Sequence, residues 1–108
     1  MKSIIILRQD GEHKNLHAVI LSLIDEYGSD IESIYFMDRA VIVLAHTDST
    51  LKQSYLTRAQ KFNIRLICCG RALTEQGLEA NSAVEGVEVA GYTDLAVSLA
   101  QAQKVFSF

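Results

Sequence analysis

The sequence contains no proline and no tryptophan, only two cysteines, and no hydrophobic run long enough to cross a membrane. Two adjacent cysteines cannot build the spaced disulfide framework of a small secreted domain. The apolar stretch at residues 4–7 is too short for a signal-peptide core and lacks a small-residue cleavage site. We therefore expect a cytoplasmic protein that does not enter the membrane, and the missing proline fits short connections between elements.

The small net charge and the small number of glycines also exclude several functions. The formal net charge is −3 and the ten lysines and arginines are scattered, so no broad cationic surface exists for direct nucleic-acid binding. The six glycines form neither a phosphate-binding loop nor a dinucleotide fingerprint, and no serine lies in a nucleophile elbow. Nucleotide cofactors and serine-hydrolase chemistry are therefore not indicated.

What the sequence does contain is a regular alternation of apolar runs and segments of helical period. With 108 residues, 49% of them hydrophobic, the chain is long enough for one domain spanning residues 1–108. The alternation predicts a flavodoxin-like, three-layer α/β/α fold with a mostly parallel sheet of about five strands. Strands are expected at residues 3–7, 31–36, 64–68, 87–90 and 105–108, and helices at 15–27, 49–62, after 70 and after 91.

Two helices carry more specific expectations. In the first, we expect Gly28 to end the helix. Its inner face should hold Leu16, Val19, Ile20, Leu23, Ile24 and Tyr27, with His17, Ser22, Asp25 and Glu26 facing outward. His13 and His17 have a metal-compatible i, i+4 spacing, but no third ligand accompanies them, so both are interpreted as surface residues. In the last helix, Thr93 or Asp94 is the expected N-cap.

One segment, residues 40–45, fits two structures. Its β-branched content is typical of a strand, yet only three residues separate it from the strand before it. A helical turn packed under the sheet edge is the alternative.

The candidate site lies at the carboxyl ends of the strands, where open α/β sheets collect catalytic groups. Cys68 and Cys69 end a buried strand and face the first turn of a helix, a position expected to favour thiolate over thiol. Because side chains alternate along a strand, only one thiol should serve as nucleophile. Supporting candidates at the same edge are Gly70, Arg71, Arg39, His46 and Arg8.

A structural interpretation of the same cysteines stays open. Free cysteine behaves as a small hydrophobe and is among the residue types most often buried. A strained vicinal disulfide is a minor alternative that would need oxidising conditions.

Five stretches of the chain form a recognisable series: IIIL at residues 4–7, IYFMDRAV at 34–41, NIRLICCGRAL at 63–73, VEVAGYTDLA at 87–96 with Ala100, and KVFSF at 104–108. In these stretches the chain resembles the DsrE/DsrF-like sulfur-relay family, and within it the TusD/DsrE type of subunit. Taken together, in this order and at this spacing, the stretches cover nearly the whole chain. Counted back from Leu73, the family's active cysteine corresponds to Cys68.

The resemblance implies that Cys68 accepts a sulfane sulfur as a persulfide from a donor protein and passes it to an acceptor, as in tRNA 2-thiolation or sulfur oxidation. It implies no metal or organic cofactor, and homo- or hetero-oligomers with DsrE/F-like chains. Where relatives often have an Arg-Gly pair after the cysteine helix, this chain reads Thr74-Glu75-Gln76-Gly77. The alternative function is a non-catalytic subunit or binding module that buries both thiols.

Overall fold

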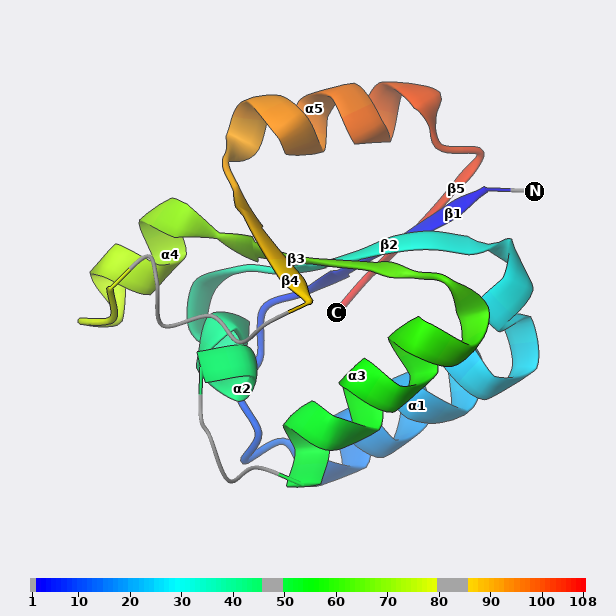
Figure 1. Ribbon diagram of the computed structural model, residues 1–108, viewed down its shortest axis with the longest axis horizontal. Coiled ribbons are helices and arrows are strands. Elements are labelled where there is room, and N and C mark those ends of the chain that lie inside the picture. The colour runs from blue at the N-terminus through cyan, green and yellow to red at the C-terminus, as the bar shows by residue number, and fades with distance from the viewer. Residues whose placement is uncertain (1, 46–49, 80–85) are drawn as a thin grey trace.

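The computed structural model describes residues 2–45, 50–79 and 86–108, and within them five parallel strands form one sheet (Figure 1). The strand order is β4-β3-β2-β1-β5. The bounds are β1 (Ser3–Leu7), β2 (Ile31–Phe36), β3 (Arg65–Cys69), β4 (Val87–Ala90) and β5 (Lys104–Ser107). The predicted parallel sheet is confirmed.

Helices cover both faces of this sheet, which confirms the three-layer arrangement. Figure 1 shows α1 (Lys14–Tyr27), α2 (Val41–Ala45) and α3 (Thr50–Phe62) on one face and α5 (Tyr92–Gln101) on the other. The short helix α4 (Gly70–Glu75) continues directly from the carboxyl end of β3. Two 3-10 helices, Gly28–Asp30 and Asp38–Ala40, precede β2 and α2. Among the described residues, none of the helices has the length and apolar content needed to span a bilayer.

The core forms where β1 and β2 pass through the middle of the sheet. All five residues of β1 are buried, and β-branched isoleucines occupy three consecutive positions in it. A strand covered on both faces has no solvent side, so a continuous apolar run replaces the alternation typical of a half-exposed strand. This explains why residues 4–7 could be recognised as a strand from sequence.

Helix α1 is rotated relative to the prediction. Its buried positions are His17, Ile20 and Ile24, whereas Val19 and Tyr27 are more than half exposed. The expected outward position of His17 is therefore wrong. An imidazole can occupy the inner face because its ring nitrogens find polar partners there, which removes the cost of burying them.

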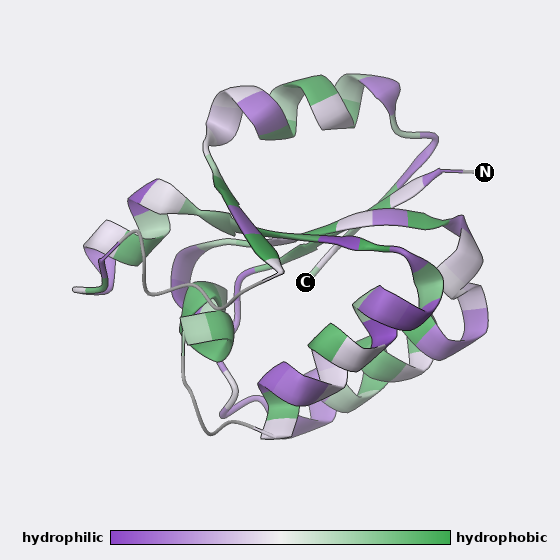
Figure 2. Ribbon diagram, viewed as in Figure 1, coloured by the Kyte–Doolittle hydropathy of each residue, from purple (hydrophilic) through white to green (hydrophobic). Residues whose placement is uncertain are grey.

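The ambiguous segment at residues 40–45 is helical. Asp38 adopts a positive φ of 50° directly after β2, the 3-10 helix Asp38–Ala40 follows, and α2 continues from Val41. Figure 2 shows α2 as an almost wholly hydrophobic helix, and it packs against α3, α4 and β3. Burial on several sides outweighs the low helix propensity of its β-branched residues.

The end of α1 and the start of α5 correct two further details. Helix α1 ends before Gly28 as expected, but Gly28 has ordinary helical dihedral angles and begins a 3-10 helix. Helix α5 begins after Gly91, so neither Thr93 nor Asp94 is its N-cap. The Asp94 carboxylate instead accepts a hydrogen bond from the Tyr35 hydroxyl at 3.3 Å and lies 3.9 Å from the Arg65 guanidinium.

Candidate functional site

Cys68 and Cys69 form the last two residues of β3, at the carboxyl edge of the sheet. In register, Cys68 lies between Phe36 of β2 and Val89 of β4, and Cys69 pairs with Ala90. Both thiols are free and buried, with relative exposures of 0% for Cys68 and 4% for Cys69. Both cysteine side chains therefore lie inside the protein.

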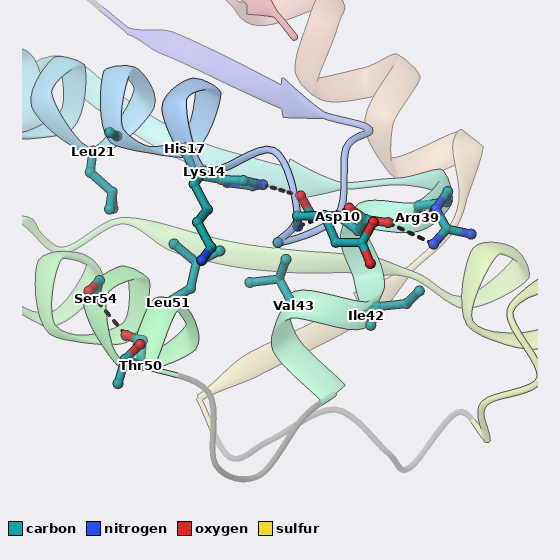
Figure 3. A pocket seen from close by; sticks show the side chains of 13 residues that line it. Asp10, Lys14, His17, Leu21, Arg39, Ile42, Val43, Thr50, Leu51 and Ser54 are labelled. Carbon is teal, nitrogen blue, oxygen red and sulfur yellow. Dashed lines mark hydrogen bonds and ion pairs between the residues drawn. The ribbon is translucent and has the colours of Figure 1, made fainter.

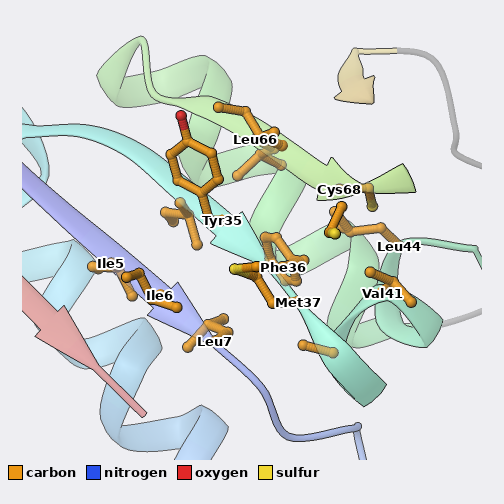
Figure 4. Close-up of a cluster of buried hydrophobic side chains, with 14 of the residues drawn as sticks. Ile5, Ile6, Leu7, Tyr35, Phe36, Met37, Val41, Leu44, Leu66 and Cys68 are labelled. Carbon is orange, nitrogen blue, oxygen red and sulfur yellow. The ribbon is translucent and has the colours of Figure 1, made fainter. Parts of the chain in front are cut away.

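The surroundings of Cys68 are apolar. Figure 4 shows it in the same cluster as Phe36 and the α2 residues Val41 and Leu44. Burial, and to a smaller extent the adjacent Cys69, raises the pKa of the Cys68 thiol to about 12. The expectation that the helix start would favour the thiolate is wrong for this conformation, because burial of the thiol disfavours its charged form.

The arginine next to the cysteine pair does not contact the thiols. Arg71 is exposed, and its Nε donates to Glu75 Oε1 at 3.1 Å on the outer surface of α4. Gly70, the first residue of α4, lies close to Val89, since an added Cβ would meet the Val89 side chain at 3.3 Å. Among the residues that the structure describes, the two thiols and the Gly70 backbone come together at this point without a cationic side chain.

The other two predicted arginines form ion pairs elsewhere on the edge. Arg39 holds the buried Asp10 carboxylate, with Nη2 at 2.6 Å and Nε at 2.8 Å from Oδ2. These contacts and the backbone N–H of Glu12 keep the pKa of Asp10 below its usual value. Arg8 donates to Ser107 Oγ at 2.6 Å and lies 3.9 Å from Asp38. His46 lies outside the described residues.

A pocket that sequence reasoning did not anticipate opens between α1, α2 and α3. It has a volume of about 660 Å³ and includes the loop after β1 (Figure 3). Its apolar lining is Ala18, Leu21, Ile42, Val43 and Leu51, and its polar lining is Asp10, Gly11, Glu12, Lys14, His17, Arg39, Thr50 and Ser54. The only local signal was the row Lys14, His17, Ala18 and Leu21 on one face of α1.

His17 forms the inner wall of this pocket rather than a metal site. Its Nε2 lies 2.8 Å from the Asp10 carbonyl oxygen and 3.1 Å from that of Gln9, and its Nδ1 lies 2.7 Å from the Tyr55 hydroxyl. Every ring nitrogen is thus engaged. Within the described ranges, no group of three histidine, cysteine, aspartate or glutamate side chains could hold a metal ion.

A family model described as the DsrE/DsrF-like family matches residues 1–108, the entire chain. The chain belongs to the DsrE/DsrF-like family. This confirms the resemblance, and the family is associated with sulfur transfer. No curated protein sequence matches the chain significantly.

Solved structures with the same fold extend over nearly the full length of this family member. The ychN protein from E. coli is 19% identical, with 100% of both chains covered and a TM-score of 0.76. MTH1491 from Methanobacterium thermoautotrophicum, described as a protein of unknown function, is 17% identical over 99% of this chain and 98% of its own, with a TM-score of 0.80. BT1422 from Bacteroides thetaiotaomicron is 19% identical over 99% and 94%, with a TM-score of 0.70. At these identities the likeness concerns the fold.

Proposed function

We propose that this protein is a cytoplasmic sulfur-relay subunit that carries a persulfide on Cys68. The observation that supports the proposal best is the position of Cys68 at the carboxyl end of β3, immediately before α4, in a chain of the DsrE/DsrF-like family. Cys69, its neighbour on the same strand, is the alternative carrier. Sulfur donor and acceptor proteins are the expected partners, within homo- or hetero-oligomers of DsrE/F-like chains.

The proposed reaction needs no oxidant and no metal. The Cys68 thiolate attacks the terminal sulfur of a donor persulfide, a new S–S bond forms, the donor S–S bond breaks, and the donor leaves as a thiolate. In the second step an acceptor thiolate attacks the terminal sulfur held on Cys68. Cys68 then leaves as a thiolate, and one sulfane sulfur has moved from donor to acceptor.

Burial of the thiol sets a condition on this chemistry. At an exposure of 0% and a pKa of about 12, Cys68 is a neutral thiol at physiological pH and no donor sulfur can reach it. Reaction therefore requires the apolar side chains packed around Cys68, including Val41 and Leu44 of α2, to move aside when a partner binds. Exposure of the sulfur would at once lower its pKa toward the ordinary value, because the raised pKa arises mainly from burial.

The same burial favours a second function, that of a non-catalytic subunit. In that case the thiols are packing residues, and Arg71, Arg39 and Arg8 keep the carboxylate and hydroxyl partners that they have here. Such a subunit would contribute its fold to an assembly without carrying sulfur.

Intact-mass analysis after incubation with a persulfide donor separates the two functions. Wild type, Cys68→Ser and Cys69→Ser are compared, and one added sulfur corresponds to about 32 Da. An adduct that is lost only in Cys68→Ser is the expected result. An adduct lost only in Cys69→Ser would move the carrier to Cys69, and no adduct on the wild type would favour the non-catalytic subunit.

A further inference from the structure

We infer that the pocket between α1, α2 and α3 binds a small organic anion with an apolar body. The volume of about 660 Å³ falls within the range of roughly 300–1,000 Å³ that is typical of small-molecule sites. Neither cysteine lines the pocket, so this site is separate from the proposed sulfur carrier.

The apolar part of the ligand has a defined place. Leu21 of α1, Val43 of α2 and Leu51 of α3 approach the pocket from three helices, and Figure 3 shows their side chains around a common space. All three helices pack on the same face of the sheet, so packing against the core fixes the positions of the pocket walls. An aliphatic or aromatic body would remove this surface from water.

The sign of the ligand's charged group is inferred from Lys14, a cation in the pocket lining. Lys14 lines the pocket from the first turn of α1, and its ammonium makes no hydrogen bond or ion pair within the described part of the chain. Arg39 and the buried Asp10 are already paired with each other. An acidic group bound at Lys14 would gain a charge-assisted hydrogen bond without breaking an existing ion pair.

Two features of the helices agree with a bound anion. Helix α1 has no side-chain cap at its N-terminus, and neither α1 nor α3 has an acidic residue in its first turn. The first residues of both helices, Lys14 and Thr50, line the pocket, so the positive ends of two helix dipoles meet there. Besides the paired Asp10, the opposing charge among the described lining residues is Glu12, an exposed carboxylate on the loop after β1.

Glu12 and Lys14 therefore make the sign of the ligand testable. For an anion, Lys14→Gln should weaken binding and Glu12→Gln should strengthen it. For a zwitterion or a cation, Glu12→Gln should weaken binding, because the ligand's positive group would lose its partner. Lys2→Gln is the matched control, since it removes the same charge beside the amino end of β1, outside the pocket.

The experiment is an NMR titration of the full chain with octanoate, octylammonium and 1-octanol, probes that share one apolar body. Octanoate should bind saturably, with shifts centred on the amides of α1 and α3 that line the pocket. Lys14→Gln should weaken octanoate roughly 5- to 10-fold, the scale of a partly exposed charge-assisted contact, and Lys2→Gln should leave it unchanged. Dispersed spectra of each variant check the fold.

Three results would overturn the inference: no saturable binding of octanoate, equal or tighter binding of octylammonium or 1-octanol, or weaker octanoate binding in Glu12→Gln. Cys68→Ser should bind octanoate as the wild type does. A negative octanoate titration would thus leave the sulfur-relay proposal unaffected. A negative persulfide assay would likewise leave the ligand-binding inference for this pocket unaffected.

Discussion

The Nδ1 atom of His17 lies 2.7 Å from the hydroxyl oxygen of Tyr55, and both side chains are almost completely buried. Nε2 faces two backbone carbonyl oxygens, which only accept hydrogen bonds, so Nε2 carries the proton and Nδ1 accepts from the tyrosine. The imidazole thereby connects the loop after β1 to α3. This one side chain positions two walls of the pocket.

Removing the tyrosine hydroxyl should destabilise the fold. Tyr55→Phe leaves a buried ring nitrogen without a partner, at a cost of about 1–3 kcal/mol in the free energy of unfolding. Urea denaturation measures it, and Tyr27→Phe, at an exposed tyrosine, is the control expected to change stability by less than about 0.5 kcal/mol. In a double-mutant cycle with His17→Phe, the two effects should sum to more than the double variant loses. Simple additivity would contradict the coupling.

Alkaline pH should weaken the wild type through Cys68. Its folded pKa of about 12 exceeds the value of 9.0 of an unperturbed thiol, so above pH 9 the unfolded chain holds fewer protons than the folded chain. Stability is therefore complete below pH 9 and is lost as pH rises toward 12, by at most about 1.4 kcal/mol per pH unit. Urea denaturation at pH 8 and pH 10 should show a smaller loss for Cys68→Ser than for wild type. Equal losses would mean that Cys68 is not buried in solution.

The thiols should react slowly in the native protein. Ellman's reagent should label both cysteines at once in urea and react much more slowly with the folded chain, because thiolate content and access are both low. Arg71→Gln should leave the native rate unchanged, since the Arg71 guanidinium pairs with Glu75. A clear fall in the native rate of this variant would show that Arg71 acts on the thiols after all.

Gly28 should resist substitution for a steric reason. A Cβ at this position would overlap the Phe62 ring at the end of α3, although the dihedral angles of Gly28 suit any residue. Gly28→Ala should lower the free energy of unfolding by about 1–3 kcal/mol, the usual cost of overpacking. Gly11→Ala, whose Cβ would reach only ordinary contact with Leu51, is the control for thermal denaturation. Equal melting temperatures for the two variants would contradict the packing argument.

The strands and the place of Cys68 could be predicted because local sequence determines them. Residues 4–6 are β-branched and adjacent, and such a run has few stable alternatives to a buried strand. The rotation of α1 could not be predicted in this way. His17 is buried because it bonds to Tyr55, which lies 38 positions away in the sequence. Hydropathy alone predicts that a histidine lies on the solvent-exposed face of a helix.

The burial of Cys68 at the candidate site could not be predicted from the local sequence either. The same sequence that puts Cys68 at the end of β3 also puts α2 over it, and whether residues 40–45 formed a strand or a helix was open until the fold was known. The raised pKa of Cys68 depends on that packing. The pocket could not be predicted because its lining comes from three separate segments of the chain, none of which carries a motif.

The buried position of Cys68 also bears on how long the protein lasts. Peroxide attacks thiolates that it can reach, and beyond the sulfenic acid the oxidation of cysteine is essentially irreversible. A neutral sulfur at 0% exposure is protected from that attack. If Cys68 carries sulfur as proposed and opens only to a bound partner, its thiol is exposed to oxidants only during those encounters.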